Sequence, residues 1–171
     1  MKKTIILYAT IIILLPIITY YVMHKKPQIP NVNNQVYVVG DESYTVIDGK
    51  SGDDLIVFGE TVYGDLDKDG DTDAAVYIVN QSKGTGVFYY AVLVINNNGK
   101  YIPTSTMFLG DRIAPQNVEI HEGRAVYNFA DRRANEPMSV EPSYAKSVWV
   151  HYDIARNEIG EWVKDFEGES R

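Results

Sequence analysis

The pattern of hydrophobic positions separates the first part of the chain from the rest. Thr4–Met23 runs for 20 residues without a charged side chain, after Lys2 and Lys3. A helix of this length rises about 30 Å, which is the thickness of the hydrocarbon core of a membrane. Tyr20 and Tyr21 stand near its far end, where amphipathic rings favour the membrane interface. The pattern predicts an N-terminal transmembrane anchor within residues 1–26.

A cleaved signal peptide is the alternative interpretation of the same segment. It requires an apolar region of roughly 7–15 residues followed by small residues at a cleavage site. Here the apolar run is longer, and it leads into Tyr-Tyr-Val-Met-His-Lys-Lys without an Ala-x-Ala pattern. We therefore favour the uncleaved anchor. Lys2 and Lys3 are balanced by Lys25 and Lys26 across the span, so these charges do not fix its orientation.

After a linker rich in Pro and Asn at residues 27–35, the pattern changes to short runs of Val, Ile, Tyr, Phe and Thr between turn signals. Such runs predict a β-rich domain over residues 36–171. The expected strands are Val36–Val39, Tyr44–Ile47, Asp54–Phe58, Ala74–Val79, Val87–Ile95, Tyr101–Leu109, Val118–His121, Arg124–Ala130 and Val148–Asp153.

Three dipeptides between these runs are typical of hairpin turns, because each contains a glycine that tolerates a positive φ: Asp48-Gly49, Asn98-Gly99 and Glu122-Gly123. One short helix stays open at Asn157–Phe166, where Ile159, Trp162 and Phe166 are spaced three and four apart. The fold class is predicted to be mostly β, a single antiparallel sheet or sandwich-like domain after one transmembrane helix.

Composition narrows the possible functions. The chain has 23 acidic against 16 basic residues, a net charge of −7, and this balance argues against a nucleic-acid partner. It has no cysteine, which excludes disulfides, zinc–thiolate sites, a thiol nucleophile and a lipid-modified cysteine.

The most informative motif is an acidic loop, Gly64-Asp65-Leu66-Asp67-Lys68-Asp69-Gly70-Asp71-Thr72-Asp73. So many carboxylates in one turn are unfavourable unless a cation lies among them or the loop extends into water. Alternating oxygens at positions 1, 3 and 5 of a tight loop converge on one point, and a glycine at position 6 permits the turn. The spacing therefore predicts a metal site, with side-chain oxygens from Asp65, Asp67, Asp69 and Asp73 and the backbone carbonyl of Asp71.

The expected ion is Ca²⁺. Ligands that are all oxygen favour a hard cation, and Mg²⁺ is less well suited because it demands a strict octahedron and keeps its waters. A helix–loop–helix site would have a glutamate at position 12, where this chain has Val76 followed by a β-like run. A structural clip is favoured over a sensor. Sites of this kind in extracellular modules bind with Kd of about 10⁻⁴–10⁻³ M and would be empty at cytosolic calcium levels, which predicts a domain outside the cytosol.

Two polar loops with Asp-Arg dipeptides offer a second kind of chemistry, at residues 109–116 and 131–138. Arg112, Arg132 and Arg133 could bind an anion, although pairing with neighbouring acids is favoured. A small hydrolase would need a concave pocket that joins Glu136, Asp111, Arg112 or His121.

The order GDLDKDGDTDAAV, GTGVFYY, LGDRIAPQ and YNFADRRANEPM resembles a group of uncharacterised bacterial exported proteins, over roughly Tyr44 to Met138. The acidic loop itself resembles the calcium loops of integrin-type propeller blades and dockerin-like modules. The resemblance implies an exported N-terminus and one small β-rich domain, and it adds no catalytic residue.

Taken together, these observations predict an exported calcium-binding β domain on the bacterial inner membrane, facing the periplasm or the cell exterior. Its expected role is a binding or structural module of the cell envelope. An envelope hydrolase and an accessory subunit with an envelope protein partner are the alternatives.

Overall fold

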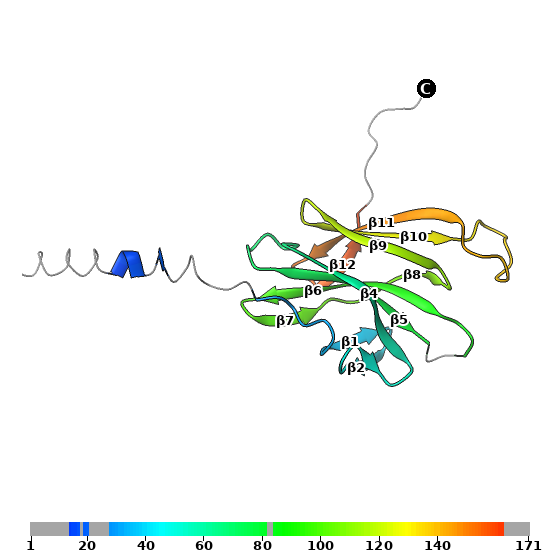
Figure 1. Ribbon diagram of the computed structural model, residues 1–171, viewed down its shortest axis with the longest axis horizontal. Coiled ribbons are helices and arrows are strands. Elements are labelled where there is room, and N and C mark those ends of the chain that lie inside the picture. The colour runs from blue at the N-terminus through cyan, green and yellow to red at the C-terminus, as the bar shows by residue number, and fades with distance from the viewer. Residues whose placement is uncertain (1–13, 18, 21–27, 82–83, 163–171) are drawn as a thin grey trace, which may run out of the picture.

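The computed structural model describes residues 14–17, 19–20, 28–81 and 84–162 (Figure 1). This part of the chain is mostly β, as expected. Its strands are β1 Val36–Val39, β2 Glu42–Thr45, β3 Lys50–Ser51, β4 Leu55–Gly64, β5 Asp73–Asn80, β6 Phe88–Asn97, β7 Lys100–Pro103, β8 Met107–Asp111, β9 Ala114–His121, β10 Arg124–Asp131, β11 Tyr144–Asp153 and β12 Glu158–Glu161.

The described strands form three antiparallel sheets, so the sheet is not single. The largest has six strands in the order β3-β4-β5-β6-β7, with β8 pairing along β6 beyond β7. A four-stranded sheet has the order β12-β11-β10-β9, and β1 and β2 form a separate hairpin. Nearly all of these neighbours follow one another in sequence, which is typical of antiparallel meanders.

The six-stranded sheet is covered on both faces (Figure 1). One hydrophobic cluster joins alternate residues of β5 and β6, such as Val76 and Val92, to Tyr37 of the β1–β2 hairpin. The opposite cluster joins the residues between them, such as Tyr77 and Leu93, to Tyr127 of the four-stranded sheet. Because both faces are covered, every residue of β5 is buried. This explains why the segment is a continuous apolar run with no polar alternation.

The three predicted hairpin turns are confirmed. Each is a two-residue connection in which both residues have positive φ: 51° and 83° at Asp48-Gly49, 53° and 90° at Asn98-Gly99, and 51° and 76° at Glu122-Gly123. Positive φ at both central positions defines the type I′ turn, whose twist matches that of the flanking strands.

One expected strand is wrong, and the element left open near the C-terminus is a strand over its described part. The single strand expected at Tyr101–Leu109 is two strands, β7 and β8, separated at Thr104, where the hydroxyl of Thr104 accepts a hydrogen bond from the backbone of Leu93. The segment Asn157–Phe166, where the sequence leaves a helix open, contains the strand β12 over Glu158–Glu161, which pairs with β11. Ile159 is buried in the core cluster, whereas Trp162 lies beside Trp149 and lines the groove on the other face, so their spacing of three also fits a strand with apolar contacts on both faces. Residues 163–166 lie outside the described residues.

Residues 28–35, the described part of the expected linker, pack against the domain. Val32 is buried in the core cluster, and its carbonyl accepts a 2.6 Å hydrogen bond from the hydroxyl of Tyr37. Most of the predicted anchor lies outside the described residues. Among those that are described, no helix has the length and apolar character needed to cross a membrane.

Candidate metal site

The acidic loop connects β4 to β5. β4 ends at Gly64, which pairs with Asp73 at the start of β5, so the strand register closes the loop at its base. Within it, Lys68 and Gly70 have positive φ, 68° and 89°. The glycine at position 6 therefore makes the sharp turn that the motif predicts.

Backbone amides of the loop point at its own carboxylates. The Asp65 carboxylate accepts hydrogen bonds from the amides of Lys68 at 2.7 Å and Gly70 at 3.2 Å. The Asp67 carboxylate accepts one from the amide of Asp69 at 3.1 Å. These bonds fix the carboxylates and offset part of their mutual repulsion.

Asp73 is the buried member of the loop. Its side chain is 0% exposed, and its two oxygens accept hydrogen bonds from the backbone amides of Leu66 at 2.7 Å and Asn96 at 2.8 Å. Burial raises the pKa of Asp73 to about 6, although these hydrogen bonds act in the opposite direction. The pKa of Asp67 is also raised, first by burial and then by the neighbouring charge of Asp69. Without a counter-ion, it therefore costs free energy to keep these two carboxylates ionised in the folded protein.

Three of the five predicted residues come together. Asp65, Asp67 and Asp73 each place one carboxylate oxygen within 4.8 Å of the others. Oxygens bound to one Ca²⁺ at about 2.4 Å lie at most about 4.8 Å apart, so this spacing fits a shared ion. The carboxylates of Asp69 and Asp71 are not in the group, and Asp69 is exposed, with Oδ1 accepting a hydrogen bond from the amide of Asp71. The carbonyl of Asp71 stays a prediction.

The loop lies against the β9–β10 turn. The side chain of Lys68 and the carbonyl of Asp65 approach Gly123 so closely that a Cβ there would meet them at 3.2 and 3.6 Å. A depression of about 210 Å³ lies beside this contact, and its lining includes Asp67, Arg124 and Tyr152. The pKa of Tyr152 is raised, mainly by burial and then by the charges of Asp67 and Asp73. The candidate site thus joins both main sheets.

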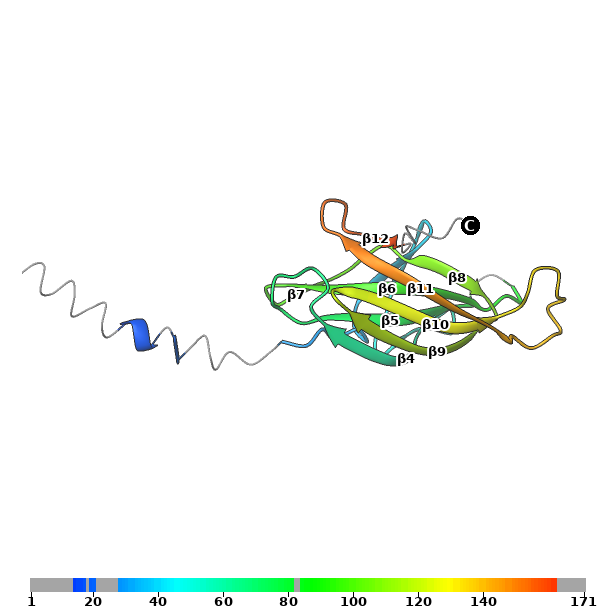
Figure 2. The same ribbon diagram turned by 90° about the horizontal axis from the view of Figure 1, so that it is seen from above.

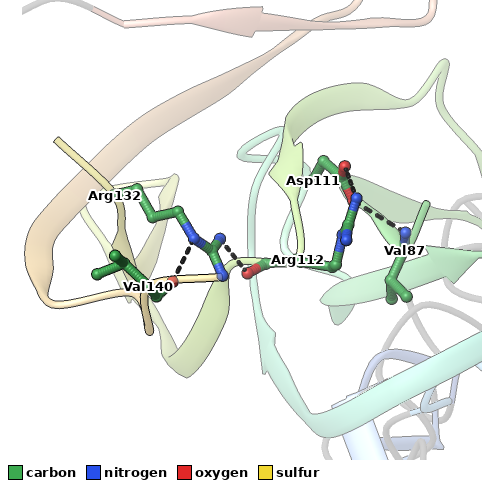
Figure 3. Close-up of polar contacts among 5 residues, drawn as sticks. All are labelled: Val87, Asp111, Arg112, Arg132 and Val140. Atoms are coloured by element: carbon green, nitrogen blue, oxygen red, sulfur yellow. Dashed lines mark hydrogen bonds and ion pairs between the residues drawn. The ribbon is translucent and has the colours of Figure 1, made fainter. Parts of the chain in front are cut away.

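The Asp-Arg loops use their guanidinium groups within the protein (Figure 3). Arg112 makes two hydrogen bonds to the carboxylate of Asp111, which lowers the pKa of that carboxyl, and Asp111 also accepts from the amide of Val87. Arg132 donates to the carbonyls of Val140 and Arg112 and so connects the two loops. Arg133 pairs with Glu136 at 3.7 Å. The favoured interpretation, internal pairing, is confirmed for Arg112 and Arg133.

His121 does not join the other residues named for a hydrolase. Asp111 and Arg112 lie just before β9 begins, whereas His121 is its last residue, so the full length of the strand separates them. The partner of His121 is Glu119, whose Oε2 lies 2.7 Å from Nε2, and this contact lowers the pKa of Glu119.

One surface was missed by the sequence analysis. On the outer face of the four-stranded sheet, Trp149 and Trp162 lie beside a groove of about 780 Å³ that His121 and Arg124 also line. The sequence signal was the alternation in β11, where Trp149 stands between two core residues, Val148 and Val150. Comparisons of the chain with protein families, curated proteins and solved structures find no match.

Proposed function

We propose that the acidic loop binds one Ca²⁺ ion, which acts as a structural clip in an exported, membrane-anchored β domain. The observation that carries the proposal is the convergence of Asp65, Asp67 and Asp73 within 4.8 Å, with Asp73 fully buried. Three carboxylates at such distances repel one another, most strongly at the buried Asp73, and a divalent ion removes that cost.

The geometry favours Ca²⁺ over Mg²⁺. The three carboxylates come from one short loop in which backbone amides already occupy some of the carboxylate oxygens. Ca²⁺ accepts irregular sets of six to eight oxygens and can complete its shell with water and a backbone carbonyl. Mg²⁺ requires a near-ideal octahedron at shorter distances, and it releases its own waters reluctantly.

The ion would connect three parts of the fold. Asp73 begins β5 and is bonded to the amide of Asn96 on β6, while Asp65 and Lys68 contact the β9–β10 turn at Gly123. An ion held by Asp65, Asp67 and Asp73 therefore holds the β4–β5 connection against both sheets. This position supports a structural role rather than a sensor role.

The setting follows from the same chemistry. We propose an anchor within residues 1–26 in the bacterial inner membrane and a domain that faces the periplasm or the cell exterior, where millimolar calcium fills sites of modest affinity. There the domain acts as a binding or structural module of the cell envelope.

The test is thermal unfolding of the full chain in detergent, with CaCl₂, with MgCl₂ and without metal. At about 10 mM Ca²⁺ and a Kd of about 10⁻⁴–10⁻³ M, binding to the folded state adds about 1.4–2.7 kcal/mol. We expect the Tm to rise by roughly 3–10 °C with Ca²⁺ and by less with Mg²⁺.

The matched variants change the same number of charges. Asp65→Asn plus Asp67→Asn should abolish the calcium shift. Asp53→Asn plus Asp54→Asn, at two exposed acids outside the loop, should preserve it. The absence of a shift in the wild type, or an equal shift in the loop variant, would contradict the proposal.

A further inference from the structure

The outer face of the four-stranded sheet carries an ordered set of aromatic and polar side chains. The pairing of β9, β10 and β11 places Glu119, Val126 and Trp149 in one row across the sheet. The amide of Trp162 bonds to the carbonyl of Trp149 and continues the row beyond β12. His121 and Arg124 form the next row. Figure 2 views this sheet from its outer side.

The aromatic rings line one continuous surface. The ring centroids of Trp149 and Trp162 are 5.6 Å apart, and those of His121 and Trp149 are 5.8 Å apart with an interplanar angle of 30°. Val126 on β10, which lies between the strands of His121 and Trp149, is on the same face and only 4% exposed. The rings thus form a floor with apolar faces beside the groove of about 780 Å³, a size within the roughly 300–1,000 Å³ of ligand sites.

Polar groups border this floor. Glu119 and His121 are bonded to each other and keep 45% and 52% of their side chains exposed. Arg124 lies over the ring of Trp162 at 4.4 Å and within 3.8 Å of Glu122, which is 90% exposed. The groove therefore offers both donors and acceptors at its rim, beside flat apolar rings.

We propose that this groove binds a neutral oligosaccharide of pyranose sugars. A pyranose ring has an apolar face of C–H groups, which packs on an indole ring, and a rim of hydroxyls that both donate and accept hydrogen bonds. Trp149, with Trp162 beside it, supplies the surface for the first, and His121, Arg124 and Glu122 supply partners for the second. Charged partners strengthen such hydrogen bonds.

The charges of the groove select a neutral ligand. The carboxylate of Glu122 lines the groove and would repel an anion. Among the described residues that line the groove, Arg124 is the one guanidinium, and it already contacts Glu122 and the ring of Trp162. A cation would have to displace Arg124 from the Trp162 ring. An uncharged polyhydroxylated ligand that packs on Trp149 leaves Arg124 over the Trp162 ring and brings no charge against the carboxylate.

The binding assay has an internal reporter. Trp149 and Trp162 are the two tryptophans of the whole chain, so intrinsic tryptophan fluorescence observes the groove alone. The full chain is titrated, in a detergent without a sugar head group such as an alkyl amine oxide, with cellopentaose, chitopentaose and maltopentaose. A sulfated glycan of similar length is the charged comparison. We expect a saturable spectral change with at least one neutral pentamer and none with the sulfated glycan.

The variants separate binding from folding. Trp149→Ala and His121→Ala should weaken binding of that pentamer by about tenfold or more, as measured by calorimetry. The side chain of His121 is half exposed at the rim of the groove. His121→Ala should therefore fold even if Trp149→Ala does not. Phe108→Ala, at an exposed aromatic residue on β8, is the control and should bind as the wild type does.

Three results of these titrations would overturn the proposal. They are no saturable response to any neutral pentamer at about 10 mM, affinity for the sulfated glycan alone, and unchanged affinity in both groove variants. Binding that arises only after residues 163–171 are removed would assign the groove to the chain's own C-terminal segment and would overturn it as well. Calcium enters none of these measurements, so the proposal stands or fails independently of the metal site.

Discussion

The backbone amide of Asn96 on β6 donates a 2.8 Å hydrogen bond to Oδ1 of Asp73, the first residue of β5. The second oxygen of the same carboxylate accepts from Leu66 in the acidic loop. One buried carboxylate therefore connects the loop to the central sheet, with or without a metal ion. This makes Asp73 different from the other aspartates of the motif, and the first two predictions concern it.

Asp73→Asn should destabilise the domain even in metal-free buffer. An asparagine keeps one acceptor oxygen but turns an NH₂ group toward a backbone N–H, which leaves a buried donor unsatisfied. We expect a loss of about 1–3 kcal/mol in the free energy of unfolding, measured by denaturant titration. Asp69→Asn makes the same charge change at an exposed position and should cost less than about 0.5 kcal/mol. Equal effects of the two variants would show that the buried bonds of Asp73 carry no special weight.

The stability of the metal-free domain should decrease as the pH rises from about 4 to about 6. The pKa of Asp73 is about 6 in the folded state against an ordinary 3.8, so in this range the folded state binds a proton that the unfolded chain has released. Stability then falls with rising pH. Because Ca²⁺ requires the ionised carboxylate, the Tm increase caused by calcium should grow over the same range. Thermal unfolding at about pH 4.5, 5.5, 6.5 and 7.5 tests both trends, and a calcium effect independent of pH would contradict the second.

Gly64→Ala should weaken the contact between the two main sheets. A Cβ at this position would lie 3.0 and 3.1 Å from Cδ1 and Cγ2 of Ile120 on β9, so the Ile120 side chain must move by a few tenths of an ångström. Crowding of this kind costs about 1–3 kcal/mol. In a double-mutant cycle, the variant that combines it with Ile120→Ala should be less destabilised than the sum of the single changes. Additive costs would mean that close packing on Ile120 is not the cause.

Arg132→Lys should loosen the Asp-Arg loops of Figure 3. Nε and Nη1 of Arg132 donate to the carbonyls of Val140 and Arg112, and an ammonium group cannot reproduce that fork. We expect a loss of roughly 1 kcal/mol for each hydrogen bond broken and faster amide hydrogen exchange in residues 132–143. Arg133→Lys, whose side chain is 67% exposed, should leave exchange unchanged. Protection that persists in the Arg132 variant would argue against this connection.

Local rules recovered the turns and most strands of the fold. Asn98-Gly99 strongly favours a turn with positive φ at both positions, and the short apolar run after Asp73, rich in β-branched residues, favours a strand buried on both faces. Terminal residues were harder, because Ile159 and Trp162 satisfy a helical spacing and also a strand with two apolar faces. Pairing with β11 makes this segment a strand rather than a helix. The partner strand lies outside the segment, so the local pattern does not show that pairing.

The candidate metal site was also predictable only as far as local sequence determines it. The loop supplied the aspartates and the glycine, whereas the exclusion of Asp69 from the convergent group depends on the path of the backbone after Lys68. The groove was not predictable, because Trp149 and His121 belong to strands that only the sheet order places two positions apart. Distant residues on one sheet face leave no spacing in the sequence.

The turn at Glu122-Gly123 borders two depressions at once, and Arg124 lines both the one beside the acidic loop and the groove. A calcium ion bound to Asp67, which lines the first depression, and a ligand in the groove would lie on either side of this turn, and any coupling between them is reciprocal. If calcium changes the affinity of the groove for its ligand by some factor, that ligand changes the affinity of the loop for calcium by the same factor.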